Sequence, residues 1–107
     1  MENDLNEMRR LELHELLLSL NPEAKAYFQE PENIHMQYPC FIYEVDDFDI
    51  KRANNQTYAL TRRYQVTYVS TDVTNAQHEK VARLPMSSFR RYFVADQLHH
   101  YVYSLYF

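Results

Sequence analysis

The segment "QTYALTRRYQVTYVST", residues 56–71, most constrains the fold, because its side chains alternate in character with a period of two. Apolar side chains share one face and polar ones share the other, namely Tyr58, Leu60, Tyr64, Val66 and Tyr68 against Thr61, Arg63, Gln65 and Thr67. This period is that of a strand in a sheet with one buried face. Arg62 falls on the apolar face, which suits a sheet margin, a snorkelling side chain or an interface.

Four further segments have the composition of strands. The run "CFIYEVDDFDIKR", residues 40–52, precedes residues 56–71, and the intervening "ANNQ" can supply a hairpin turn. A short strand is expected in "AYFQEP", residues 26–31. Two more strands, "SFRRYFVA" and "HHYVYSLYF", are joined through Asp96 and Gln97 near the end of the chain.

Two segments favour helices. Residues 2–24 carry an apolar stripe that Asn21 and Pro22 bring to an end, and its members are Leu13, Leu16, Leu17 and Leu20, with Leu5 and Met8 expected to continue it upstream. A shorter helix is expected within residues 74–85, with Val81 and Leu84 facing inward. The order α-β-β-β-α-β-β predicts a single α+β domain over residues 1–107. We expect a mainly antiparallel sheet of four to five strands, with the helices on one face.

The chain contains no glycine and ten tyrosines. Without glycine, the phosphate-binding loops of P-loop and dinucleotide-binding proteins are excluded. Positions that need a positive φ are then expected to hold Asn or Asp. Ten tyrosines and six phenylalanines exceed what one small core is expected to absorb, so some of them should face another chain.

Charge is distributed unevenly along the sequence. Residues 1–49 carry twelve acidic and three basic side chains, a net charge of −9, whereas residues 50–107 carry three acidic and eight basic ones, a net charge of +5. The two halves can lie against each other within one fold, or they can form complementary faces of copies arranged head to tail. The overall charge of −4 is unlike that of a general nucleic-acid binder.

The single cysteine, Cys40, cannot form an internal disulfide, and the N-terminus is charged rather than an apolar signal segment. No apolar run approaches the roughly 20 residues that a membrane helix needs. These features favour an intracellular setting without a membrane.

The segment "EVDDFDI", residues 44–50, gathers four carboxylates and is the first candidate for chemistry. A metal site needs carboxylates that converge on one point. In a regular strand Asp46 points away from Asp47 and Asp49. We therefore expect no metal site here, and interpret the cluster as a solvated strand end or an acidic interface patch.

His99 and His100, which follow Asp96, are the second candidate. Neighbouring strand residues face opposite sides, so the two histidines cannot jointly hold a metal. Asp96 and His100 can meet if the turn folds back, and a His–Asp pair can act as a general base. No nucleophile accompanies them, because Cys40 is expected to be buried and inert. We predict no catalytic, metal or cofactor site, and hence no enzyme.

The segment "FRRYFV", residues 89–94, is the third candidate. Arginines between aromatic residues can hold phosphates and stack on bases. In a regular strand, however, Arg90 and Arg91 face opposite sides, so only one lies on any given surface. Pairing with carboxylates, within the subunit or across a contact, is the expected use, and a DNA contact is the alternative.

Three stretches together resemble the tail-completion proteins of long-tailed bacteriophages, also called tail terminators or tail-to-head joining proteins. They are the amphipathic start, the middle "YPCFIYEVDDFDIKRANNQTYALTRRYQVTYVSTD" and the end "LPMSSFRRYFVADQLHHYVYSLYF". The resemblance spans nearly the whole chain. Its most distinctive parts are "YPCFIY" and the closing "FVADQLHHYVYSLYF".

The resemblance implies a structural virion protein that forms a ring of its own copies, a hexamer, at the head-proximal end of the tail tube. Such a ring stops tube polymerisation and joins the tail to the head, with the tail tube protein and a connector or stopper protein of the neck as partners. It implies no cofactor, no membrane, assembly in the host cytoplasm, and a lumen that passes genome DNA without sequence-specific binding. Because the chain is short for this role, a connector or stopper of the neck is an alternative, and a small phage-encoded binding protein is another.

The closing strand is apolar on both sides, with Tyr101, Tyr103, Leu105 and Phe107 on one and Val102 and Tyr106 on the other. A chain end of this kind must be docked into its own fold, into a partner, or into both. We expect the first helix or a neighbouring subunit to cover Val102 and Tyr106. The expected interface residues are Asp46, Asp47, Arg62, Arg90, Arg91, Tyr101, Tyr103, Tyr106 and Phe107.

Overall fold

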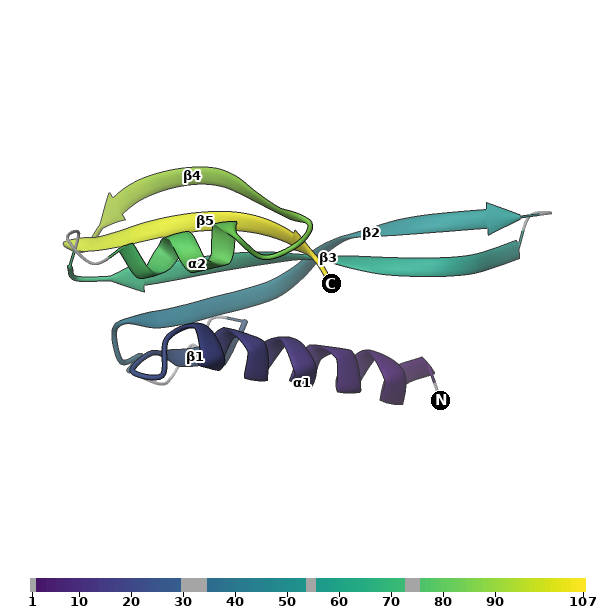
Figure 1. Cartoon of the computed structure of the whole chain (residues 1–107), viewed down its shortest axis with the longest axis horizontal. Coiled ribbons are helices and arrows are strands. Elements are labelled where there is room, and N and C mark those ends of the chain that lie inside the picture. Colours follow the sequence, from purple (N-terminus) through teal and green to yellow (C-terminus); the bar gives the residue numbers. More distant parts are fainter. Residues whose placement is uncertain (1, 30–34, 54–55, 73–75) are drawn as a thin grey trace.

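The computed structural model describes the backbone of residues 2–29, 35–53, 56–72 and 76–107, and the side chains of these residues except 2–6, 49–60 and 76. The elements follow the predicted order α-β-β-β-α-β-β, which confirms the α+β class (Figure 1). They are α1 (Glu2–Leu20), β1 (Lys25–Phe28), β2 (Cys40–Ala53), β3 (Gln56–Ser70), a 3-10 turn η1 (Ala76–His78) that leads into α2 (Glu79–Ala82), β4 (Ser87–Ala95) and β5 (Leu98–Tyr106).

The five strands form one sheet in the order β1-β2-β3-β5-β4. Three of its pairings are antiparallel, as predicted, and β1 pairs with β2 in parallel. The parallel pair arises because the chain returns to the start of β1 before β2 begins, so that Lys25 lies opposite Cys40. The sheet is therefore mixed and not purely antiparallel.

Both helices contribute side chains to one core on a single face of the sheet. Leu13 and Leu17 of α1 and Val81 of α2 are fully buried there, together with the alternating residues of β2, β3 and β5, which are Phe41, Tyr43, Tyr64, Val66, Tyr68, Tyr103 and Leu105. Leu84 packs against the same cluster, so the predicted inward faces of both helices are confirmed. Period-two strands and one helical stripe thus produce a two-layer arrangement.

Met8 does not continue the apolar stripe of α1, so that expectation is wrong. Its side chain is 58% exposed, whereas Arg10 occupies the inward side and donates a hydrogen bond to the Tyr43 hydroxyl. The reason is helical phase, since Met8 lies five residues before Leu13 and is rotated by about 140° from it. The Leu5 side chain lies outside the described residues.

The β2–β3 hairpin extends well beyond the rest of the sheet, as Figure 1 shows. Strand β3 pairs with β5 only from Arg63 to Ser70, and its earlier residues pair with β2 alone. This two-stranded part, which we call the arm, comprises residues 48–53 and 56–62 and contributes to a longest dimension of 50 Å. Tyr58, Leu60 and the Asn pair of the turn lie outside the described side chains.

In the described part of the chain, positive φ angles fall mostly on residues other than Asn and Asp, contrary to the expectation from the absence of glycine; Asn54 and Asn55 lie outside the described residues. Among the described residues they occur at Gln29, Met86, Asp96 and Gln97. Asp96 and Gln97, with φ of 52° and 64°, form the tight turn between β4 and β5. A two-residue type I′ hairpin turn requires positive φ at both central positions, so pairing of the flanking strands imposes it.

The C-terminal segment is docked into its own subunit. The Phe107 N–H donates to the Arg62 carbonyl oxygen at 3.1 Å, and Tyr103 and Leu105 lie in the core. Val102, on the opposite face, is only 4% exposed within the single chain. It lies at a hollow on the face of the sheet away from the helices, and other residues of its own subunit cover it. For this residue the expected cover by the first helix or a neighbouring subunit is therefore wrong.

Candidate assembly surfaces

A β-bulge in β2 brings Asp46 and Asp47 to the same face of the sheet. Val45 lies opposite Tyr64 and Asp47 lies opposite Arg63, which leaves Asp46 as an extra residue. Arg63 reaches both carboxylates, with 2.9 Å from its Nε to Asp46 Oδ1 and 3.6 Å from its guanidinium to Asp47 Oδ2. The prediction that the two aspartates face opposite sides is wrong, because a bulge adds one residue to the alternation.

A second β-bulge, in β4, brings Arg90 and Arg91 to the same face of the sheet. Phe89 lies opposite Tyr103 and Arg91 lies opposite Val102, which leaves Arg90 as the extra residue. The Arg90 Nε donates to Ser104 Oγ at 2.7 Å, and Arg91 lines the hollow beside Val102. Because Ser104 and Val102 share one face of β5, both arginines lie on that face, and the expectation that they point apart is wrong.

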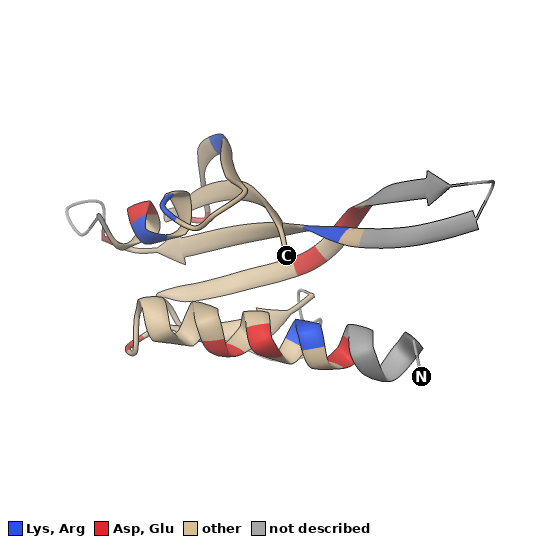
Figure 2. Ribbon diagram, turned by 45° about the vertical axis from the view of Figure 1, so that its right-hand side comes forward, with Lys and Arg blue, Asp and Glu red and all other residues tan. Residues whose placement is uncertain are grey.

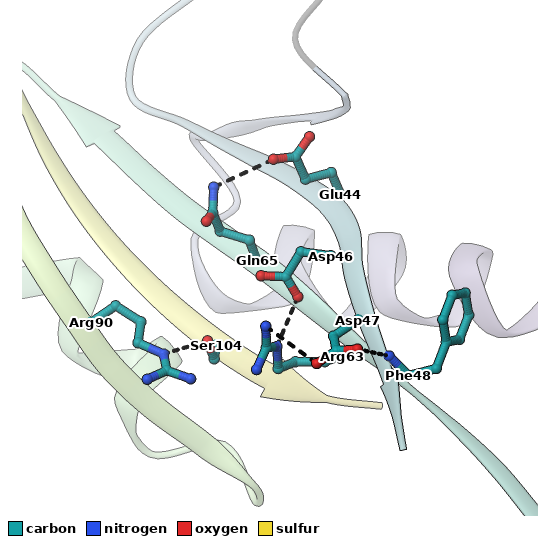
Figure 3. A network of polar contacts seen from close by, with 8 residues as sticks. All are labelled: Glu44, Asp46, Asp47, Phe48, Arg63, Gln65, Arg90 and Ser104. Atoms are coloured by element: carbon teal, nitrogen blue, oxygen red, sulfur yellow. Dashed lines mark hydrogen bonds and ion pairs between the residues drawn. The ribbon is translucent and has the colours of Figure 1, made fainter. Parts of the chain in front are cut away.

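The face of the sheet away from the helices therefore carries a polar network (Figure 3). Gln65 Nε2 donates to Glu44 Oε1 at 3.4 Å beside the Arg63 pairs, and Arg90 lies across β5 from them. The hydrogen bond to Asp46 is the main cause that raises the pKa of Arg63. Acidic residues from the first half of the chain thus pair with a basic residue from the second half inside one subunit.

A hollow of about 370 Å³ lies on this same face. It is lined by residues of β2, β3, β4, β5 and the β4–β5 turn, namely Ile42, Glu44, Gln65, Thr67, Arg91, Phe93, Ala95, Asp96, His100 and Val102. The His100 Nδ1 donates to the Leu98 carbonyl oxygen at 3.0 Å, and its ring stacks on Phe93 with centroids 4.5 Å apart. Asp96 and His100 share the hollow, but no hydrogen bond or ion pair joins them among the described contacts.

His99 faces the other side of β5, where its Nδ1 lies 2.6 Å from the Tyr92 hydroxyl. The two histidines therefore point apart, as predicted. Cys40 is fully buried at the start of β2. Within the described part of the chain, no three His, Cys, Asp or Glu side chains are grouped in a way that could hold a metal ion.

The edge strand β4 presents a row of exposed apolar side chains on the helix side of the sheet. These side chains, which we call the β4 row, are Phe89, Tyr92 and Val94, with exposed fractions of 55%, 46% and 55%. The Phe89 ring contacts Tyr103 and the Tyr92 ring contacts Tyr101, so the row continues the core outward. Strand β4 has β5 on one side and is the margin of the sheet on the other.

The β4 row is not predicted from the sequence, because the segment of residues 89–94 is interpreted there through its arginines and not through its apolar side chains. The relevant signal is the large apolar residue on each side of Arg90 and Arg91. Exposure of that row, however, follows from the edge position of β4 and from the shortness of α2, which has four residues. A sequence pattern alone specifies neither property.

The aromatic residues of the predicted interface mostly contact their own subunit. Tyr103 is 2% exposed and its hydroxyl lies 2.9 Å from His78 Nδ1, so we omit it from the proposed interface. The Tyr101 ring stacks on His78 at 3.7 Å. Tyr106 and Phe107 are half-buried where the arm begins. Burial raises the pKa of both Tyr101 and Tyr103.

Arg62 is half-buried at the base of the arm, where β3 begins to pair with β5. Its guanidinium lies 5.9 Å from the centre of the Phe48 ring, and its buried Nε has no hydrogen-bond partner among the described residues. Phe48 itself is 47% exposed. At the base of the arm, Arg62 therefore has a buried Nε without a hydrogen-bond partner among the described residues, next to the exposed ring of Phe48.

None of the helices, as far as the structure describes them, is long and apolar enough to cross a membrane. Comparison with known proteins finds no protein-family model and no curated protein that matches this chain.

Proposed function

We propose that this protein is a structural subunit of a long-tailed bacteriophage, the terminator of its tail. In this role, copies form a ring, a hexamer, on the head-proximal end of the tail tube. The ring halts tube polymerisation and joins the tail to the connector or stopper of the neck. The proposal rests on the resemblance carried by the amphipathic start and by residues 38–72 and 84–107, and on one structural observation, the exposed β4 row.

The β4 row supports assembly because it lies on an edge strand, whose outer side another chain can reach. Here three large apolar side chains stand next to one another on such a strand, each about half exposed. Contiguous exposed apolar surface of this kind marks protein–protein contact sites. The bulge at Arg90 places both arginines on the far side of the strand and so leaves the row free of charge.

The arm offers a second, different surface for contact. An isolated two-stranded ribbon is marginally stable in water, so residues 48–53 and 56–62 gain from cover by another chain. Two different contact surfaces on one subunit produce head-to-tail contacts, which close into rings when the rotation permits. The ring would need no cofactor, and genome DNA would pass through its lumen without base-specific contacts.

The first experiment measures assembly directly. Native mass spectrometry and sedimentation of the purified protein, alone and with tail tube protein, should show closed oligomers. Tyr92→Gln should shift them toward monomers, whereas Thr71→Gln, an exposed control outside the β4 row, should not. A strict monomer in both mixtures would contradict the proposal.

A second experiment separates the terminator from the neighbouring roles. Particles assembled without this protein should carry overlong tail tubes if it is the terminator. Tails of normal length that fail to join heads would instead indicate a connector or stopper. Absence of the protein from purified virions would indicate a small phage-encoded binding protein.

A further inference from the structure

The outer side of α1 carries a second exposed apolar surface. Met8 and Leu11 are 58% and 49% exposed, and with Glu12 and Glu15 they line a shallow hollow of about 460 Å³. We call these four residues the α1 patch. We propose that the α1 patch of one subunit docks on the β4 row of the next copy, an inference that rests on the proposed ring assembly.

The β4 row has the character of a sheet surface that lacks its covering helix. On this face α1 packs against β1, whereas α2 packs against β4 only through its single short turn. Figure 1 shows α1 running below β1 and β2, while β4 arches beyond α2 at the far side of the subunit. An amphipathic helix from another chain would complete the layer and cover Phe89, Tyr92 and Val94.

The α1 patch is suited to that place because α1 is apolar on two sides. Leu13 and Leu17 face the core of their own subunit, and Met8 and Leu11 face outward. A helix that is apolar on both sides is expected to be covered on both. Within the described residues of a single chain nothing covers the outer side.

Exposed charges of opposite sign lie at the rims of the two surfaces. Glu12 is paired with Arg9, but Glu15 forms no ion pair with any residue whose side chain is described. The exposed cation Arg83 lies between α2 and β4. Lys80 instead donates a 2.8 Å hydrogen bond to the Leu20 carbonyl oxygen of its own α1, next to the exposed acid Glu79. Figure 2 shows acidic residues along α1 with basic residues among them, and basic residues at α2 and after it next to an acidic one. Opposite charges at the rim favour one orientation and one partner.

The two surfaces belong to different elements, so each subunit can use α1 toward one neighbour and β4 toward the other. Such a contact is heterologous and extends from copy to copy, unlike a two-fold contact, which would use the same patch twice. The occupant of the β4 row is thus a second copy of this chain.

Cysteine cross-linking tests the contact in the full-length protein. The double variant Leu11→Cys, Tyr92→Cys, treated with a short bis-maleimide in the presence of tail tube protein, should give a ladder of covalent multimers. Each single variant and the parent, whose Cys40 is buried, should give none, and Glu23→Cys with Thr71→Cys serves as the exposed control pair. Cross-linking of Tyr92→Cys to the tube protein in place of a second copy would overturn the inference.

Equilibrium measurements give an independent readout. Leu11→Gln should raise the midpoint concentration of assembly by about tenfold or more, because truncation of a central apolar contact commonly has that effect. The monomer should keep its far-UV spectrum, since Leu11 lies on the surface. If the parent forms rings while Leu11→Gln assembles equally well and the double variant gives no ladder, the ring proposal stands and this contact is wrong. If the parent remains monomeric with tube protein, both fail together.

Discussion

The Arg9 guanidinium lies 3.7 Å from the centre of the Phe107 ring, and its Nε donates a 3.0 Å hydrogen bond to the Phe107 carbonyl oxygen. The first helix therefore holds the last residue of the chain, although the two residues are 98 positions apart. Chain ends fray unless they are fixed in this way. The contact accounts for an aromatic residue at the C-terminus without a second subunit.

Replacement of Arg9 by alanine should lower the free energy of unfolding by about 0.5–1 kcal/mol, the usual contribution of an exposed cation–π contact. Urea denaturation followed by circular dichroism measures the change. Glu12→Gln is the matched control, because it removes the Arg9–Glu12 ion pair and leaves the stack on Phe107. Equal losses in the two variants would show that the stack on Phe107 contributes nothing.

The stability of the protein should depend on pH through His78. Burial lowers the pKa of this imidazole below its ordinary value of 6.5. His78 therefore takes up a proton more readily in the unfolded chain than in the folded one. The stability that the neutral imidazole contributes is complete above the pKa of His78 in the unfolded chain, and it is lost as pH falls through the pKa of His78 in the folded protein. We expect the urea midpoint to decrease on acidification from about pH 7 to pH 5.

Two variants identify His78 as the cause. His78→Asn should flatten this part of the pH profile. Tyr103→Phe removes the hydroxyl 2.9 Å from His78 Nδ1 but leaves the imidazole buried, so it should keep the slope. A profile for His78→Asn as steep as that of the parent would refute the assignment.

Arg63→Gln should destabilise the protein, because it leaves Asp46 and Asp47 side by side on one face without their cation. The loss should be smaller at about 1 M salt than at low salt, since screening weakens repulsion between the two carboxylates. Denaturation at both salt concentrations measures it. Asp46→Asn should partly restore Arg63→Gln, and Arg91→Gln should have little effect. A loss that salt does not reduce would argue against the electrostatic cause.

Gln97→Gly should stabilise the protein by about 0.5–1 kcal/mol, because a residue with a side chain is strained at a φ of 64° and glycine is not. Ala95→Gly, two positions earlier in β4, should do the opposite, since it only adds flexibility to a strand. Thermal unfolding of both variants gives the comparison. A destabilised Gln97→Gly would mean that contacts of the Gln97 side chain outweigh the strain.

The sequence predicts several of the interface residues by their charge, but it does not predict on which face of the sheet they lie. Their charges point to Asp46, Asp47, Arg90 and Arg91, but regular alternation predicts that the two members of each pair lie on opposite faces. The two bulges reverse this, because an extra residue in one strand is fixed by the register of its neighbour. Tyr103 is among the expected interface residues and is buried in its own subunit, whereas Phe89 and Tyr92 are exposed because β4 is the edge strand of the sheet.

The sequence by itself determined the elements and their order. The period-two pattern of residues 56–71 and the leucine stripe of residues 13–20 are local features, and each needs only its own segment to specify a strand or a helix. Tertiary structure alone decided that β1 is parallel to β2, that Val102 is covered within its own subunit and that the β4 row is exposed. These outcomes depend on pairing, packing and the reach of α2, which are relations between segments distant in the sequence.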